Sequence, residues 1–158
     1  MIRVQEEDFD IGAEIAALTS GKTMIGGVAT FTGLVRDMAP VEGVDQPISA
    51  MTLEHYPGMT EKKLAEIEAE ANRRWPLDAS LIIHRYGRLE PGDQIVLVAC
   101  ASAHRQAAFD ACQFLMDWLK TDAPFWKLED TDDGGVWVET RASDEAAAAR
   151  WTGKPENT

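Results

Sequence analysis

The amino-acid sequence predicts an α+β domain with a mixed or antiparallel sheet. Segments with the two-residue period of strands and segments with the 3.6-residue period of helices both occur, but without the regular strand–helix–strand alternation of parallel sheets. The chain has 158 residues, enough for one domain, and it shows no internal repeat and no linker. We therefore expect residues 1–151 to form a single domain and residues 152–158 to be a frayed tail.

The N-terminal part of the chain predicts two strands with a short helix between them. Residues 2–5 predict the first strand, and residues 11–18 predict a helix that begins after Asp10. Residues 24–36 predict a long strand interrupted by glycines, which places Arg36 at a strand end. A charged residue at a strand end lies beside the following loop, where functional side chains are common.

A loop and a further strand follow Arg36. Residues 37–47 contain two prolines and a glycine, so we expect a mobile loop. Such a loop belongs either to a functional site or to a plain surface connection. Residues 48–55 predict the strand that comes next.

The middle of the chain predicts a second helix and two more strands. We expect the helix to begin at Thr60, whose hydroxyl can cap it, and to be ended by Pro76. Strands are expected over residues 80–88 and 94–101, joined by the turn residues Pro91-Gly92-Asp93. The apolar residues at helical spacing that should face inward are Leu64, Ile67, Ala71 and Trp75.

The longest predicted helix runs from residue 102 to about residue 120. We expect Ser102 to cap it and Pro124 to prevent its continuation. Its apolar face recurs at spacings of three and four and comprises Ala108 or Phe109, Cys112, Met116 and Leu119. After it come a short segment at 125–128, an expected turn at 132–135, a strand at 136–140 and a helix from 143 towards Trp151.

Composition argues against several classes of protein. A net charge of −12 with only 15 Lys and Arg disfavours a nucleic-acid surface, because phosphate contacts need clustered cations. The sequence has no long apolar run that would predict a transmembrane helix, and the acidic N-terminus lacks the apolar segment of a signal peptide. Cys100 and Cys112 lack metal-site spacing with a histidine, so we expect reduced, buried thiols in a cytoplasmic protein.

Basic residues near the two ends of the long helix are the candidate functional residues. His104 and Arg105 lie in its first turn, where the helix dipole and free amides attract anions; the alternative is that both side chains are simply solvated. Lys120 lies in the last turn, where the dipole favours a cation whether or not it has a function. Lys127 follows two aromatic residues, so it is either partly desolvated and reactive or extended over aromatic surface.

Six stretches of the chain combine into a specific pattern. They are LEHYPGMTEKKLAEI (53–67), RWPL (74–77), IIHRYGRLEPGD (82–93), SAHR (102–105), DWLKTDAPFWK (117–127) and the closing VETRASD with Trp151. The pattern covers nearly the whole chain and resembles the MoaE family, the large, catalytic subunits of molybdopterin synthase. The pairing of SAHR with LKTDAPFWK is the most specific part of the resemblance.

The resemblance implies an α/β hammerhead fold and a homodimer. The dimer would bind two copies of a small ubiquitin-like sulfur carrier, giving a heterotetramer. The carrier's C-terminal Gly-Gly thiocarboxylate would enter a pocket of the large subunit and pass its sulfur to cyclic pyranopterin monophosphate. Two such rounds would make the dithiolene of molybdopterin. We expect no cofactor, metal, nucleic acid or membrane.

The resemblance also implies roles for individual residues. Lys120 and Lys127 match the family's two pocket lysines and are the expected catalytic residues. The residues at positions that match substrate-contacting stretches are Leu34, Val35, Arg36, His104, Arg105, Lys120, Lys127, Leu128 and Glu129. Leu34 and Leu128 stand where basic residues are frequent in the family, so no phosphate contact is carried over to them. By the same resemblance, His104 and Arg105 would come from the protomer opposite the one that supplies the lysines.

Two other functions compete with sulfur transfer. A non-catalytic domain of the same fold would only dock a ubiquitin-like protein, and a small hydrolase would act on an acidic metabolite. A docking domain has no need of basic residues at both ends of one helix. A hydrolase needs a nucleophile with its base, or metal ligands, and the sequence shows neither pattern.

Overall fold

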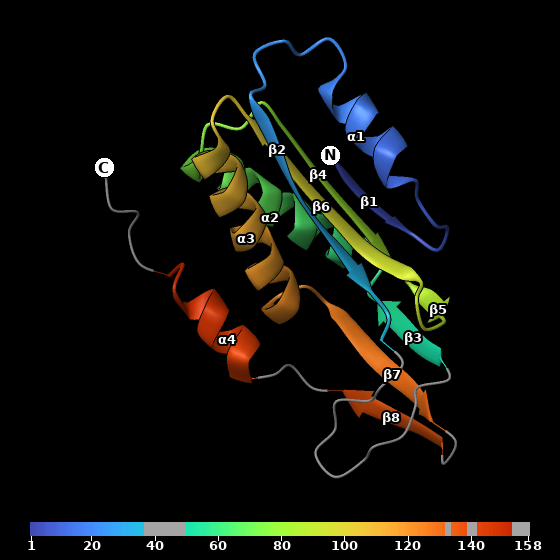
Figure 1. Cartoon of the computed structure of the whole chain (residues 1–158). Coiled ribbons are helices and arrows are strands. Elements are labelled where there is room, and N and C mark those ends of the chain that lie inside the picture. Colours follow the sequence, from blue (N-terminus) through green and yellow to red (C-terminus); the bar gives the residue numbers. More distant parts are fainter. Residues whose placement is uncertain (37–49, 132–133, 139–141, 153–158) are drawn as a thin grey trace.

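The first of two four-stranded sheets has the strand order β1-β4-β6-β2 (Figure 1). Its strands are β1 (Ile2–Gln5), β2 (Gly27–Leu34), β4 (Ala79–Arg85) and β6 (Gln94–Ser102). β1 pairs with β4 in parallel, whereas β4 and β2 both run antiparallel to β6. The computed structural model describes residues 1–36, 50–131, 134–138 and 142–152, with the backbone alone between residues 126 and 145.

The second sheet has the order β5-β3-β7-β8 and is antiparallel throughout. Its strands are β3 (Ala50–His55), β5 (Gly87–Leu89), β7 (Phe125–Thr131) and β8 (Gly134–Val138). The predicted α+β class with a mixed sheet is therefore confirmed. The expected loop at 37–47 and most of the expected tail at 152–158 lie outside the described residues.

One predicted strand is wrong in extent, because residues 80–88 belong to two sheets. β4 ends at Arg85 in the first sheet, and β5 begins at Gly87 in the second. Gly87 has a φ of 88°, a backbone conformation that costs glycine little and other residues much more. The chain can therefore turn sharply there and cross from one sheet to the other.

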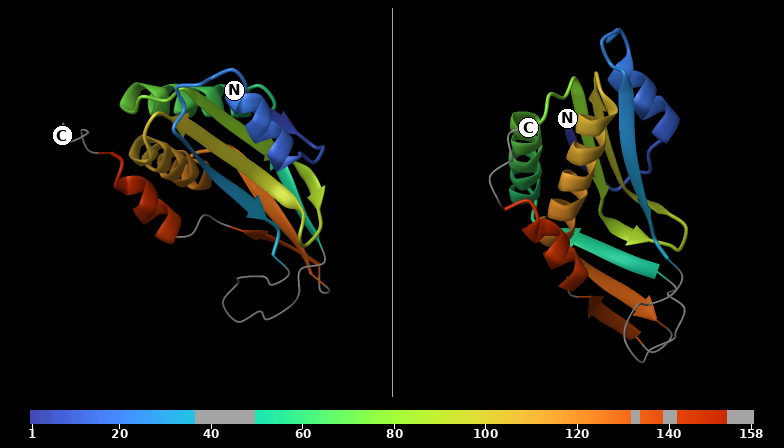
Figure 2. Two further views of the ribbon diagram at one scale, coloured as in Figure 1. Left: turned by 45° about the horizontal axis from the view of Figure 1, so that its top comes forward. Right: turned by 60° about the vertical axis from the view of Figure 1, so that its left-hand side comes forward.

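The helices cover both faces of the first sheet (Figure 2). α1 (Ile11–Thr19) packs on one face, against Leu81, Ile83 and Leu97. α2 (Met59–Arg74) and α3 (Arg105–Thr121) pack on the other. The strands β4 and β6 are buried on both faces, which explains why their sequences are almost continuously apolar. Among the described helices, none has the length and apolarity needed to cross a bilayer.

Both predicted hydroxyl caps, at Thr60 and Ser102, are wrong. α1 begins after Asp10 as predicted, and Asp10 caps it, since its Oδ1 accepts a hydrogen bond from the Ala13 amide at 2.8 Å. α2 is instead capped by Gly58, and the Thr60 hydroxyl donates to the Tyr56 carbonyl at 2.8 Å. The Ser102 hydroxyl donates to the Pro76 carbonyl, and the helix begins only after His104.

The predicted inner faces of α2 and α3 are confirmed. Leu64, Ile67 and Ala71 of α2 are buried. Trp75, the C-cap residue of that helix, packs against the same core. On α3 the alternative between Ala108 and Phe109 is resolved in favour of Ala108, because Phe109 is 60% exposed. The remaining predicted residues of that face, Cys112, Met116 and Leu119, are buried.

Both cysteines are free and lie inside the core formed by the sheet, α2 and α3. Burial raises the pKa of the Cys112 thiol to about 11. Burial also raises the pKa of Cys100, and the nearby Cys112 adds to the shift. Neutral, inaccessible thiols of this kind act as small apolar core residues.

Candidate functional site

The two ends of α3 carry two separate groups of cations. Arg105 begins the helix and Lys120 lies in its last turn. Fifteen residues at a rise of 1.5 Å each separate their Cα atoms by roughly 22 Å. No single small ligand can therefore contact both residues within one chain.

The N-terminal end of α3 is an exposed, electropositive surface. His104 is the N-cap residue with extended backbone angles (φ −127°, ψ 142°), and its side chain makes no capping hydrogen bond. No acidic residue occupies the first turn, and both His104 and Arg105 are exposed. Free amides, the helix dipole and two basic side chains can together hold an anion.

Close backbone contact with β2 sets the position of this end. The Gly26 amide donates to the Ser102 carbonyl at 2.9 Å, directly before the helix. A Cβ atom at Gly26 would overlap the backbone carbonyl oxygen of Ala103. The adjacent Gly27 is not crowded, since the nearest atom to an added Cβ would be the Arg105 Cα at 4.0 Å.

We expect Gly26→Ala to displace the segment that carries His104 and Arg105. The added methyl group forces the two backbones apart, which should lower the free energy of unfolding by about 1–3 kcal/mol. Gly27→Ala is the matched control and should cost much less. Urea unfolding of both variants measures the difference, and equal losses would contradict a role for the close contact.

The C-terminal end of α3 presents Lys120 to solvent. The helix ends at Thr121. Its C-cap residue, Asp122, lies two residues before Pro124, and the Asp122 amide donates to the Trp118 carbonyl at 2.8 Å. The predicted stop before Pro124 is thus confirmed. In the described part of the chain Lys120 forms no ion pair, so its charge remains available to a ligand.

Arg36 lies at the same end of the molecule as Lys120. Both β2 and α3 run antiparallel to β6, so their C-terminal ends point the same way (Figure 1). Val35 is buried, its amide donates to the Asp93 carbonyl, and its carbonyl accepts from the Gly92 amide. These bonds fix the strand end, leaving Leu34 and Arg36 exposed.

The backbone of β7 brings the remaining predicted residues to this end. Lys127 lies opposite Leu53 of β3 on one side and Val138 of β8 on the other. Leu128 and Glu129 follow along the same strand. The structure thus places the predicted residues of β2, the end of α3 and β7 at one end of the molecule, and leaves His104 and Arg105 at the opposite end.

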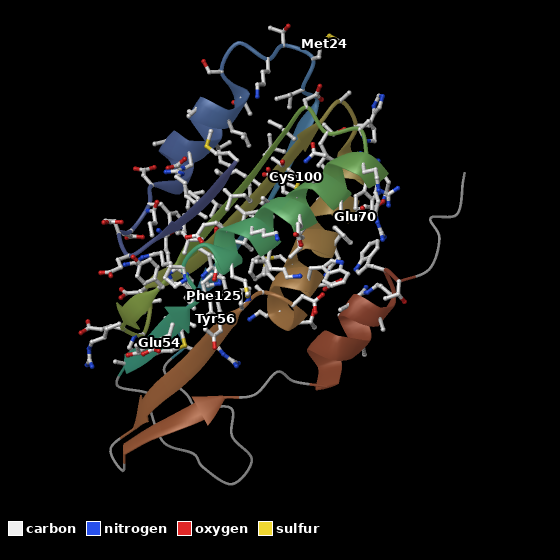
Figure 3. The ribbon with its side chains drawn as sticks, turned by 180° about the vertical axis from the view of Figure 1, so that it is seen from behind. Met24, Glu54, Tyr56, Glu70, Cys100 and Phe125 are labelled. Atoms are coloured by element: carbon white, nitrogen blue, oxygen red, sulfur yellow. The ribbon has the colours of Figure 1, made fainter. Side chains whose placement is uncertain are left out.

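A cluster of rings at the start of β7 was missed by reasoning from the sequence. The ring of His84 stacks on Phe125 with centroids 3.7 Å apart, and His55 lies 4.4 Å from Tyr86 and 5.9 Å from Phe125. Tyr56 lies beside this junction of the two sheets (Figure 3). Phe125 thus anchors the strand that carries Lys127. The histidines looked unrelated in the sequence. The pairing of β3 with β7 places His55 opposite Phe125, and the stacking of His84 of β4 on the same ring brings the second histidine there.

Comparison with known proteins identifies the class of this fold and site. The family model described as "MoaE protein" matches residues 4–122. The molybdopterin synthase catalytic subunit of Ralstonia nicotianae is 60% identical over 150 residues, which cover 95% of this chain and 83% of that one. Its counterpart in Escherichia coli strain K12 is 53% identical, with 95% of this chain and 97% of that one covered.

Solved structures agree with this class. The molybdopterin biosynthesis MoaE protein from Burkholderia ambifaria superimposes with a TM-score of 0.81 at 53% identity, covering 98% of this chain and 99% of that one. Molybdopterin synthase from Staphylococcus aureus has a TM-score of 0.77 at 31% identity, and the match covers 87% of this chain and 96% of that one. The class is therefore that of the catalytic subunits of molybdopterin synthase, enzymes of sulfur transfer in molybdenum cofactor biosynthesis. The chain belongs to the MoaE family.

Proposed function

We propose that this chain transfers sulfur from the C-terminal thiocarboxylate of a small ubiquitin-like carrier subunit to cyclic pyranopterin monophosphate. Two transfers would form the dithiolene of molybdopterin. The observation that supports this proposal most directly is the placement of exposed cations at the ends of β2 and α3 on a protein of net charge −12. An anionic phosphate substrate needs such a local concentration of positive charge.

Within this proposal the cations have different tasks. Arg36 and Arg105 are permanently charged and would hold the phosphate through paired hydrogen bonds. His104 would donate or relay a proton. Lys120 would act on the carrier terminus or the reacting substrate, and Lys127 would position the substrate and stabilise developing charge. Leu34, Val35, Leu128 and Glu129 complete the proposed substrate-contacting stretches.

The complete site would require two copies of the chain. β2 is an edge strand of the first sheet, and it carries the exposed apolar residues Phe31 and Leu34, while α3 carries the exposed Phe109. If two copies met along β2 and α3 about a two-fold axis perpendicular to α3, their α3 helices would run antiparallel. Arg105 of one copy would then lie beside Lys120 of the partner, which unites the two cation groups that are roughly 22 Å apart within one chain.

The carrier would approach each composite site with an extended tail. A Gly-Gly terminus suits a narrow channel because it lacks side chains and permits close backbone approach. Two carriers on one homodimer would give a heterotetramer, with residues 1–151 of this chain acting as a single domain. The free, buried Cys100 and Cys112 support a reducing compartment, and we propose the cytoplasm.

We expect Arg36→Ala and Arg105→Ala to weaken pyranopterin binding far more than carrier binding. Each change removes charge-assisted hydrogen bonds worth roughly 1.5–3 kcal/mol, or about 10- to 150-fold in Kd. Arg88→Ala, which changes a cation of the short strand β5, is the control. Separate titrations of each ligand measure the effect, and an unchanged pyranopterin affinity in both variants would reject the phosphate role.

Reconstitution tests the function as a whole. The purified chain is mixed with a thiocarboxylated carrier and cyclic pyranopterin monophosphate, and the dithiolene product is measured together with loss of the thiocarboxylate. Product formation supports sulfur transfer. Carrier binding without product would favour the docking domain, and thiocarboxylate loss without product would favour a hydrolase.

A further inference from the structure

A buried carboxylate on α3 is bonded to the C-terminal end of the described chain. Asp117 is 6% exposed, and its Oδ2 accepts a hydrogen bond of 2.5 Å from the indole Nε1 of Trp151. Its Oδ1 accepts a bond of 2.8 Å from Gln113, and the Arg150 Nε lies 3.6 Å from Oδ2. Both oxygens are therefore satisfied, as a buried charge requires.

The indole ring of Trp151 is also held by packing from two helices. It meets Trp75 and Phe114 edge to face, with centroids 5.6 and 5.7 Å away. Arg74 donates a hydrogen bond of 2.9 Å to the Trp151 carbonyl while its guanidinium lies over the Phe114 ring. The hydrogen bond from Trp151 to Asp117, together with these ring contacts, forms what we term the Trp151 latch.

The latch acts on the turn of α3 that carries Lys120. Asp117 lies three residues before Lys120, and the Thr121 hydroxyl donates to the Asp117 carbonyl at 3.0 Å. The last turn of a helix has carbonyls without helical partners and tends to fray. Asp117, whose two carboxylate oxygens both accept hydrogen bonds, lies one turn earlier. These bonds limit fraying of the last turn and therefore help to hold Lys120 in position.

The latch also closes the chain segment that contains both lysines. Asp117 and Trp151 are 34 residues apart, and between them lie Lys120, β7 with Lys127, β8, and α4 (Ala142–Ala149). α4 lies alongside the C-terminal half of α3 (Figure 1). Joining the two ends of this segment removes conformational freedom from everything inside it.

We propose that the Trp151 latch is a positioning device for the two lysines, with Asp117 and Trp151 as positioning residues for sulfur transfer. The inference rests on the proposed role of Lys120. Loss of the latch lets the last turn of α3 open, so that Lys120 spends less time in its reactive position. The consequence is a lower kcat, with a smaller change in KM because Arg36 and Arg105, which would hold the phosphate, lie outside the closed segment.

Three variants test the latch. Trp151→Phe keeps an aromatic ring but removes the N–H donor, and it should lower kcat about tenfold and speed amide hydrogen exchange at residues 118–121. Asp117→Asn keeps an oxygen acceptor and should remain within about threefold of the wild type, whereas Asp117→Ala should resemble Trp151→Phe. Asn72→Ala, which removes bonds to Glu68 and Ser80 on α2 and β4, is the control for general loss of stability.

The two readouts separate failure of the latch from failure of the proposed function. Unchanged amide exchange in Trp151→Phe would overturn the latch whatever the lysines do. Faster exchange with unchanged kcat would overturn the positioning role, as would an equal loss of kcat in Asn72→Ala at equal stability. A fully active Lys120→Ala enzyme would instead refute the role proposed for Lys120, without altering what the exchange measurement says about the latch.

Discussion

Lys120→Ala should abolish sulfur transfer while leaving the fold and carrier docking intact. Positioned proton transfer or nucleophilic attack by one side chain contributes about two to four orders of magnitude in rate. Lys120 is exposed in the last turn of α3 and forms no ion pair within the described residues, so its removal should cost little stability. Single-turnover formation of the dithiolene, measured beside thermal unfolding, separates the two effects.

Lys120→Arg distinguishes a chemical role from a purely electrostatic one. Guanidinium stays charged and cannot give up its proton near neutrality, so this variant should be as inactive as Lys120→Ala. Lys63→Ala on α2, another exposed lysine, is the control and should retain full activity. A Lys120→Arg enzyme with near-normal turnover would show that only positive charge is needed, and the proton-transfer or nucleophilic role would be abandoned.

Co-expression of His104→Ala and Lys120→Ala subunits should restore activity that neither variant has alone. In a mixed dimer with shared sites, one site contains both substitutions and the other contains none. Random pairing makes half of the dimers mixed, so about a quarter of all sites should be intact. The physical reason is the separation of roughly 22 Å between the two ends of α3, which one ligand cannot span within a chain.

A double variant provides the control for this experiment. Subunits that carry both His104→Ala and Lys120→Ala inactivate both sites of a mixed dimer with wild-type chains. Equal amounts of double-variant and wild-type subunits should therefore leave about a quarter of the activity of an all-wild-type sample if the sites are shared. If each chain has its own site, about half should remain. No recovery in the first mixture despite demonstrated subunit exchange would count against a shared site.

Local features of the fold followed from local sequence. Three features depend on neighbours within one or two turns: the start of α1 after Asp10, the end of α3 before Pro124 and the inner face of α2. All three predictions are confirmed. The caps expected at Thr60 and Ser102 failed for a common reason. Their hydroxyls bond to the carbonyls of Tyr56 and Pro76, and the second of these partners comes from a distant part of the chain.

The sequence by itself determined the fold class, the family pattern and the identity of the cations that we propose for the site. These depend on residue type and spacing, which are visible along a single chain. Only the tertiary structure decided that residues 80–88 divide between two sheets and that Arg36 shares an end of the molecule with Lys120 but not with Arg105. Only the tertiary structure placed Trp151 on Asp117. Such contacts join residues tens of positions apart, and their partners are selected by strand register and core packing, which no local pattern encodes.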